Sequence, residues 1–199
     1  IDIEGLHVDA NRRAQTGLWI QNLAAVYSDA STPNVRLVGV GGSNGRRELL
    51  ADYFGDGICV KGWFAHVLAR DCYCDGMTAA VGAIDLGVGL NGFYIGREPN
   101  VGYPIAKEII NPTIGPIYSE DQVNTFNMDG IHLSDVMPSN NGDRKRAYAR
   151  ISGGYFYGCA GRAMKIQSLD VDISSPKIVV NNGPQRGGHM HPTCCVSLQ

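Results

Sequence analysis

Two aspartates that precede glycines, Asp56 and Asp129, are suited by type and spacing to acid–base chemistry. Each opens a similar segment, Asp-Gly-Ile-Cys-Val at 56–60 and Asp-Gly-Ile-His-Leu at 129–133. If these are stacked strands with one further strand between them, their Cα atoms lie roughly 9 to 10 Å apart. Carboxyl groups about 6.5–9.5 Å apart suit an inverting glycosidase, one as the acid and the other as the base that activates water. The pair therefore predicts glycoside hydrolysis.

Turn chemistry offers a second explanation for the same two aspartates. Asp and Asn are favoured before glycine because their side chains bond to nearby backbone. Other carboxylates could also form a catalytic pair: Asp75, Asp85, Glu98, Glu120, Asp121 and Asp135. Catalysis by Asp56 and Asp129 is thus one of several alternatives.

Aromatic and basic side chains recur at equivalent positions of the glycine-led segments. If the apolar residues after each glycine face inward, the residues between them face outward. One outward column would contain Trp19, Cys59, Tyr94, His132 and Lys165. The next would contain Gln21, Lys61, Gly96, Ser134 and Gln167, and the residues before the glycines would form a third, Thr16, Asp56, Asn91, Asp129 and Arg162.

These columns have the chemistry of a polysaccharide-binding strip. Sugar rings stack on aromatic side chains, and carboxylated sugars pair with Lys or Arg. The residues predicted to bind substrate are Trp19, Tyr94, His132, Lys165, Arg162 and Lys61. A basic residue such as Lys165 or Arg162 could instead abstract a sugar proton, which would make the reaction a β-elimination. The alternative is that a loop or a partner subunit covers this face, so that the same residues only pack.

A recurring glycine-led segment must position all of these residues. Copies lie at 4–8, 16–20, 56–60, 91–95 and 129–133, and a degenerate copy at 162–166 has Ala163 in place of the glycine. From Gly17 onward the steps are 40, 35, 38 and 33 residues. A strand-opening turn with a nearly constant period is typical of a solenoid, in which each coil repeats one element beside the last.

A second β-like segment follows the copies from 16–20 onward, at 34–38, 65–69, 107–111, 149–153 and 170–173. No helix of 10 to 15 residues separates the strands, which excludes a βαβ sheet. Residues 46–54 are the best helical stretch, and loops are expected at 96–104, 115–128 and 137–145. The pattern predicts an all-β fold, a single-domain parallel β-helix of about five coils over residues 1–199.

Composition restricts the function further. A net charge of −2 argues against a nucleic-acid partner, and no apolar run approaches the roughly 20 residues that cross a bilayer. Both chain ends read as interrupted strands, so we expect a piece of a longer polypeptide, with a processed mature chain as the alternative.

The cysteine and histidine spacings predict no metal and no cofactor. Cys72 and Cys74 share one strand face, and they and the other cysteines lack the spacing of a zinc site. We expect buried free thiols, with disulfides as the alternative. His189 and His191 would share one strand face, but no Cys or acidic pattern beside them completes a metal site.

The segments at 5–11 (Gly-Leu-His-Val-Asp-Ala-Asn) and 17–22 (Gly-Leu-Trp-Ile-Gln-Asn) resemble coils of right-handed parallel β-helix proteins of the pectate-lyase-like superfold. The segments at 127–134 and 161–167 resemble coils of bacteriophage tailspikes and related polysaccharide-processing proteins. The resemblance covers about residues 3–180. Residues 127–129 (Asn-Met-Asp) are also similar to the Asn-Thr-Asp element of polygalacturonases, whose Asp-Asp pair and Gly-His-Gly element are missing here.

The resemblance implies a homotrimer that recognises and depolymerises a bacterial surface polysaccharide, located in a virion tail or outside the cell. Hydrolysis is favoured over lyase chemistry. The alternative is a non-enzymatic segment of a virion or cell-surface spike that only binds glycan or supports the oligomer.

Overall fold

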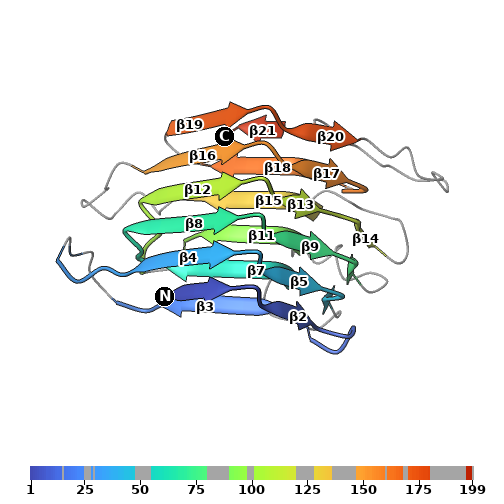
Figure 1. The fold of residues 1–199 in the computed structure, drawn as a ribbon, viewed down its shortest axis with the longest axis horizontal. Helices are drawn as coiled ribbons and strands as arrows, with labels where there is room; N and C mark the ends of the chain where they lie inside the picture. The colour runs from blue at the N-terminus through green and yellow to red at the C-terminus, as the bar shows by residue number, and fades with distance from the viewer. Residues whose placement is uncertain are drawn as a thin grey trace.

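The computed structural model describes residues 1–14, 16–24, 28, 30–47, 55–79, 90–97, 101–119, 128–135, 147–159, 161–167, 170–179 and 196–198. Within these ranges the regular elements are all strands, and their pairings are all parallel. The strands lie one above another from the N-terminal to the C-terminal end (Figure 1). No helix in this part of the chain is long and apolar enough to cross a membrane.

Three sheets of six strands and one of three strands make up the stack. Sheet A contains β1 (Asp2–Glu4), β4 (Asn34–Val38), β8 (His66–Arg70), β12 (Ala106–Ile110), β16 (Tyr148–Ser152) and β19 (Asp170–Ser174). Sheet B contains β2 (His7–Asp9), β5 (Gly41–Ser43), β9 (Tyr73–Asp75), β13 (Thr113–Ile114), β17 (Tyr155–Tyr157) and β20 (Lys177–Val179).

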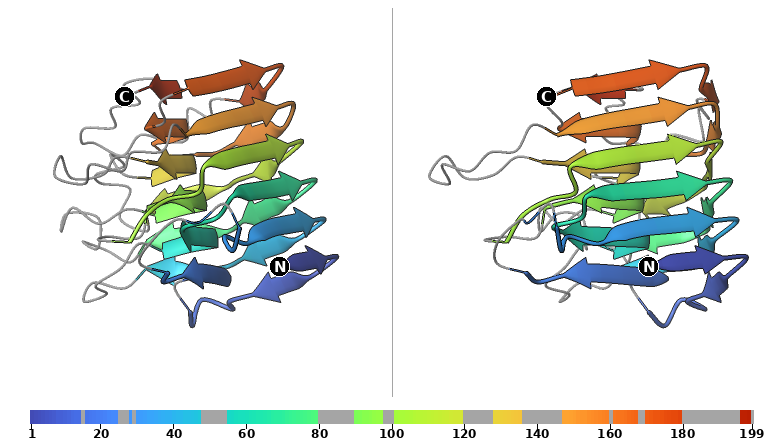
Figure 2. Two further views of the ribbon diagram at one scale, coloured as in Figure 1. Left: turned by 90° about the vertical axis from the view of Figure 1, so that its left-hand side faces the viewer. Right: turned by 60° about the vertical axis from the view of Figure 1, so that its left-hand side comes forward.

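Sheet C contains β3 (Leu18–Asn22), β7 (Gly55–Gly62), β11 (Leu90–Gly96), β15 (Met128–Ser134), β18 (Arg162–Gln167) and β21 (Val196–Leu198). The short sheet D contains β6 (Arg46–Arg47), β10 (Met77–Ala79) and β14 (Ile117–Ser119). The chain repeatedly passes from A to B to C and back to A, so consecutive passes lie side by side (Figures 1 and 2). This is the arrangement of parallel strands that a β-helix or solenoid requires.

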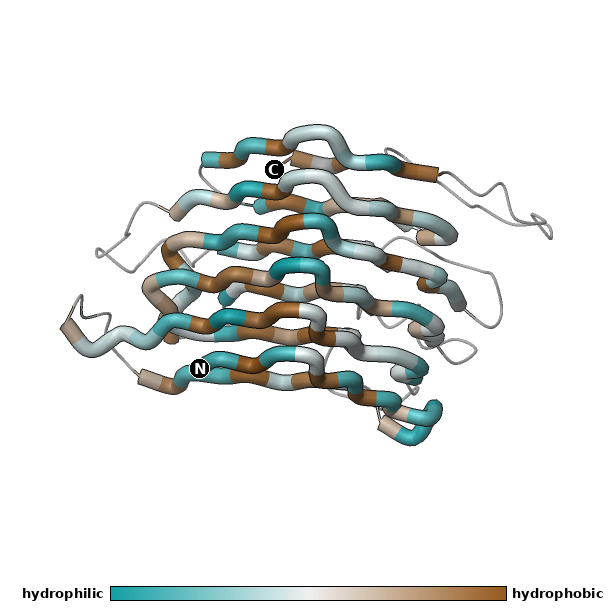
Figure 3. Tube along the Cα trace, in the orientation of Figure 1, coloured by the Kyte–Doolittle hydropathy of each residue, from teal (hydrophilic) through white to brown (hydrophobic). Residues whose placement is uncertain are grey.

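The core fills the space enclosed by the sheets. Sheet A contributes Leu37, Ile109 and Ile151 to one apolar cluster. Sheet B adds Cys74, Ile114 and Phe156, and sheet C adds Ile58, Phe93 and Ile131. Apolar and polar residues alternate along the strands in Figure 3, as expected where only one face of a strand is buried in the core.

Close backbone approach explains the recurring glycine. A Cβ on Gly57 would lie 2.8 Å from the carbonyl oxygen of Gly92, and one on Gly92 would lie 2.6 Å from that of Gly130. On Gly130 it would lie 2.5 Å from the carbonyl oxygen of Ala163. Each glycine therefore makes room for the next strand, and the predicted alignment with Ala163 as the last copy is confirmed by the pairing of Ile131 with Met164.

The earliest glycine-led segment, 4–8, is not equivalent to the later ones, which corrects the sequence prediction. Gly5 directly follows β1, at the corner between sheets A and B, and has a left-handed φ of 64°. The corresponding corners have left-handed φ values at Gly39, Asp71, Asn111, Gly153 and Ser175. A single left-handed residue thus turns the chain from sheet A into sheet B in successive passes.

Most predicted strand segments are confirmed, since β4, β8, β12, β16 and β19 coincide with them to within a residue. The helical prediction for 46–54 is wrong at Arg46–Arg47, which form β6, and its remainder lies outside the described residues. The predicted loop at 115–128 contains β14, because Ile117 joins the core and β14 pairs with β10. The predicted loop at 137–145 lies outside the described residues.

Cys72 and Cys74 face the same side, as their spacing predicts, and that side is the core. Among the described residues, Cys59, Cys72, Cys74 and Cys159 form no disulfide. Cys194 and Cys195 lie outside the described residues.

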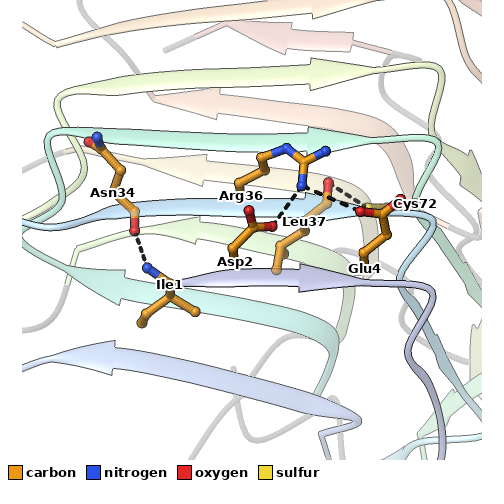
Figure 4. A network of polar contacts seen from close by, with 7 residues as sticks. All are labelled: Ile1, Asp2, Glu4, Asn34, Arg36, Leu37 and Cys72. Carbon is orange, nitrogen blue, oxygen red and sulfur yellow. Dashed lines mark hydrogen bonds and ion pairs between the residues drawn. The ribbon is translucent and has the colours of Figure 1, made fainter.

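Polar contacts on the outer face of sheet A join β1 to β4 (Figure 4). Arg36 lies 2.7 Å from the carboxylate of Asp2 and 3.6 Å from that of Glu4. The N-terminal ammonium donates to the carbonyl oxygen of Asn34 at 2.8 Å. The side chains of Arg36, Asp2 and Glu4 are largely exposed, and ion pairs between exposed side chains contribute little to stability.

Candidate functional site

The three predicted columns lie along sheet C in the predicted order. Tyr94 pairs with Cys59 on one side and with His132 on the other, and His132 pairs with Lys165. Asn91 likewise lies between Asp56 and Asp129. The eight predicted site residues therefore belong to one sheet, and its parallel register brings them together.

Most residues of the predicted outward columns do not form the open strip that the sequence predicts. Tyr94, His132 and Lys61 are each 5% exposed, although they belong to the predicted outward columns. Trp19, on β3, is 39% exposed, and Lys165, on β18, is half-buried. Over much of sheet C, the residues that the strand alternation places on the outer face are thus buried.

Asp129 is held by Arg162 from the next strand. Arg162 Nε donates to Asp129 Oδ1 at 2.6 Å, and Nη2 donates to Oδ2 at 3.2 Å. Both side chains are almost fully buried. Burial raises the pKa of the Asp129 carboxyl, and the Arg162 guanidinium opposes that rise. Such a two-bond pair between buried groups fixes the geometry of both side chains.

Asp56 is fully buried, and it is hydrogen-bonded to Asn91 on the neighbouring strand; each strand of the stack is called a rung. Asn91 Nδ2 donates to Asp56 Oδ1 at 2.8 Å. The Asn91 side chain stands between the two aspartates in the column, so Asp56 and Asp129 are two rungs, or about 10 Å, apart along the sheet. The spacing agrees with the predicted one, while burial and these contacts separate both carboxylates from solvent.

Aromatic rings and cations interlock in the neighbouring columns. Lys61 Nζ lies 4.2 Å from the centroid of the Trp19 ring and 5.4 Å from that of Tyr94. Tyr94 in turn contacts His132 edge-on, with ring centroids 5.2 Å apart. Cations over aromatic faces contribute roughly 0.5–2 kcal/mol each, more when water is excluded. The side chains of Trp19, Lys61, Tyr94 and His132 therefore form one continuous series of contacts.

His132 is neutral at physiological pH. Its pKa is lowered to about 4, mainly by burial and to a smaller extent by the nearby cations Lys165, Arg162 and Arg97, while the hydrogen bond to Gln167 acts in the opposite direction. The Nε2 atom lies 3.1 Å from Gln167 Oε1. Since that oxygen can only accept, Nε2 carries the proton.

Lys165 combines partial exposure with a perturbed amine. Burial lowers its pKa, and Asp129 opposes this while Arg162 adds to it. A lysine with a lowered pKa has a larger neutral fraction near neutral pH, so more of it is available as a general base. It is also the cation of the cluster best placed to meet a ligand from solvent.

Sequence reasoning missed a second buried ion pair. Lys107 Nζ, on β12, donates to Asp135 Oδ2 at 2.7 Å and to the carbonyl oxygen of Pro104 at 2.7 Å. Lys107 occupies a column of sheet A whose neighbours Val67 and Ala149 are core residues, so its side chain enters the stack. Burial lowers its pKa, and Asp135 opposes that shift. Asp135 was predicted only as one of several competing carboxylates.

Sequence reasoning also missed the aromatic residues of sheet B. His7 and Tyr73 stack with ring centroids 5.5 Å apart, and Tyr155 and Tyr157 with centroids 5.3 Å apart. The signal was present as Tyr-Phe-Tyr at 155–157, whose alternation places Phe156 in the core and both tyrosines outside.

Among the described residues no cluster of three or more His, Cys, Asp or Glu side chains is suited to a metal ion. His189 and His191 lie outside that part of the chain. Glu98, Glu120, Asp121 and Asp85, the other competing carboxylates, lie outside it as well.

Comparison with protein-family models, with curated proteins and with solved structures finds no match to this chain. The class of protein that fold and site define is therefore an all-β chain of stacked parallel sheets with a buried polar ladder on the outer face of sheet C.

Proposed function

We propose that this chain is a polysaccharide-binding segment of a right-handed parallel β-helix of about five coils, similar to those of bacteriophage tailspikes. The observation that carries the proposal is Trp19, which is 39% exposed and has the ammonium of Lys61 4.2 Å from its ring centroid. An exposed indole on β3 that is held by a cation from the neighbouring strand β7, with half-buried Lys165 farther along the column of Trp19, suits an extended glycan.

Binding is better supported than hydrolysis by Asp56 and Asp129. A general acid and a general base must reach the glycosidic oxygen and a water molecule. Both carboxylates are buried, and Arg162 occupies both oxygens of Asp129. Hydrolysis would need the Arg162 pair to open when substrate binds.

The second candidate function is cleavage by β-elimination, and the position of Lys165 favours it. Its amine has a lowered pKa, is half-buried, and lies on the rung next to His132. In such a reaction the amine takes the proton next to a sugar carboxylate, and the glycosidic oxygen leaves as the double bond forms. Arg162 would contribute positive charge beside the sugar carboxylate only if its pair with Asp129 opened.

The partners that follow from this proposal are a bacterial surface polysaccharide and two further copies of the chain in a homotrimer, in a virion tail or outside the cell. Solenoid ends need a cap or a neighbour, which an oligomer or a longer chain can supply.

The test is a titration of the 199-residue chain with capsular and O-antigen polysaccharides. We expect Trp19→Ala and Lys165→Gln each to weaken binding roughly fivefold or more. Leu23→Ala, at an exposed position just after β3, is the matched control and should bind like the wild type. Unchanged binding by both site variants would contradict the proposal.

A further inference from the structure

The outer face of sheet B carries a second column of aromatic and polar side chains, in register across six strands. It runs through His7, Gly41, Tyr73, Thr113, Tyr155 and Lys177. Unlike Tyr94 and His132 on sheet C, these side chains reach the surface. Tyr155 is 38% exposed, His7, Thr113 and Lys177 are exposed, and Tyr73 is half-buried.

A missing side chain lets one ring lie flat on this face. Gly41 separates His7 from Tyr73 in the column, and a Cβ at Gly41 would collide with the Tyr73 ring. Tyr73 therefore lies over the glycine, stacks on His7 with an interplanar angle of 11°, and brings its hydroxyl 2.6 Å from His7 Nδ1. His7 Nε2 lies 3.2 Å from Ser43 Oγ, which fixes the imidazole at both nitrogens.

A second aromatic pair lies two strands beyond Tyr73 along sheet B. Tyr155 and Tyr157 stack with an interplanar angle of 23°, and Lys177 Nζ lies 5.3 Å from the centroid of the Tyr155 ring. Thr113 occupies the rung between Tyr73 and Tyr155. Two flat aromatic pairs, separated by a small hydroxyl residue, thus form one continuous platform, which we call the sheet B platform (His7, Tyr73, Thr113, Tyr155, Tyr157).

The composition of this face distinguishes between partners. Among the described residues, the large aliphatic side chains that are exposed are Ile1, Leu6, Leu23 and Leu198, and none lies within a strand of sheet B, although Leu6 directly precedes β2. The apolar surface of the platform is therefore aromatic, with hydroxyl and imidazole groups at its edges. Protein partners favour a larger apolar centre, whereas sugar C–H faces stack on single rings and sugar hydroxyls bond to the polar edges.

The charges on this face favour an uncharged ligand. Asp9 and Asp75 lie in the adjacent outward column, while Lys177 lies at the opposite end. Hydrogen bonds from Asn44 and from the backbone of Asn11 lower the pKa of Asp9, so it is ionised at neutral pH. An acidic polymer laid along the platform would meet these carboxylates.

We propose that the sheet B platform is a binding site for a neutral oligosaccharide, separate from the cluster on sheet C. This inference rests on the proposed glycan-binding function, and it adds a second contact surface with its own ligand class. Sheet C carries Lys165 for acidic groups, and sheet B carries stacked tyrosines for neutral sugar rings.

The experiment titrates the full chain with maltohexaose, cellohexaose and neutral O-antigen fragments, and in parallel with acidic oligogalacturonate. We expect at least one neutral ligand to bind, and Tyr155→Ala to weaken that binding roughly fivefold or more. Tyr155→Phe keeps the ring and should bind within about twofold of the wild type. Tyr148→Ala removes a tyrosine of sheet A that is 44% exposed, and as the matched control it should have no effect.

Gly41→Ala tests the geometry rather than the presence of a ring. It keeps each platform side chain but displaces Tyr73, and we expect it to weaken neutral-sugar binding while thermal unfolding still reports a folded chain. Wild-type affinity in Tyr155→Ala, or binding of acidic ligands alone, would overturn the inference. Loss of binding in Trp19→Ala with no loss in Tyr155→Ala would retain the proposed function and reject the platform. The reverse pattern would retain the platform and reject the site on sheet C.

Discussion

Arg162 holds Asp129 through two hydrogen bonds, at 2.6 and 3.2 Å, and both residues are almost fully buried on the outer face of sheet C. This pair joins β15 to β18 at the point where the sequence suggested a catalytic carboxylate. Its immediate consequence concerns stability, because a buried charge that loses its partner is costly.

We predict that Arg162→Met destabilises the chain by about 3–5 kcal/mol, since it leaves Asp129 charged and buried without its cation. The double variant Asp129→Asn with Arg162→Met should recover part of that loss. Urea unfolding of the single and double variants measures both effects. Losses below about 1 kcal/mol in the single variant, together with loss of glycan cleavage in Asp129→Asn, would instead support hydrolysis by Asp129.

A second prediction concerns pH. The folded-state pKa of His132 is about 4, below its ordinary value of 6.5, so the folded chain binds fewer protons than the unfolded chain between these values. Stability therefore falls as the pH drops through this window, by about 3 kcal/mol from His132 alone. His132→Gln should remove this part of the acid sensitivity, as measured by urea unfolding at about pH 7 and pH 4.5. The same loss in wild type and variant would contradict a buried, neutral His132.

The Lys107–Asp135 pair gives a third prediction. Lys107→Met leaves Asp135 without the ammonium that lies 2.7 Å away and should cost about 3–5 kcal/mol. Lys177→Met is the matched control, because Lys177 is exposed, and its effect should stay within about 1 kcal/mol, the contribution of an exposed cation–π contact such as the one with the Tyr155 ring. Chemical denaturation compares the two variants, and equal stabilities would show that Lys107 is not buried in the core.

Glycine positions give a fourth prediction. Gly92→Ala would place a Cβ 2.6 Å from the carbonyl oxygen of Gly130 and 2.7 Å from Ile114 Cγ2, which should cost about 1–3 kcal/mol. Gly39→Asn should cost less than about 1 kcal/mol, because Gly39 has open space around a Cβ and Asn111 adopts the same left-handed conformation at an equivalent corner. Thermal unfolding ranks the two variants, and the opposite order would contradict the stacking.

The register of sheet C could be predicted from the sequence because its strands are long and share a glycine. The spacing of Gly57, Gly92 and Gly130 alone aligns Asp56 with Asn91 and Tyr94 with His132, and the structure has the same pairs. Close approach of adjacent backbones requires the glycine, so the repeat has a direct physical cause.

The strands and corners of sheet B could not be found in the same way. Strands of two or three residues, such as β13, are too short to show alternation. Asp71, Asn111 and Ser175 share a backbone conformation with Gly5 but not a side-chain type. The repeat of this corner therefore cannot be recognised in the amino-acid sequence.

Burial of the outer face of sheet C also could not be predicted from the sequence. Alternation tells which side of a strand faces the core, but it does not tell whether the opposite side meets water. Tyr94 and His132 are outward in register and yet almost inaccessible, whereas Tyr155 is outward and exposed.

The most direct test of the account is to incubate the full chain with a panel of capsular and O-antigen polysaccharides and to measure both the bound fraction and the polymer length. We predict saturable binding of at least one polysaccharide at unchanged polymer length, weakened by Trp19→Ala or Tyr155→Ala and unaffected by Tyr148→Ala. Absence of binding across the panel, or binding equally strong in both Trp19→Ala and Tyr155→Ala, would contradict a glycan-binding role.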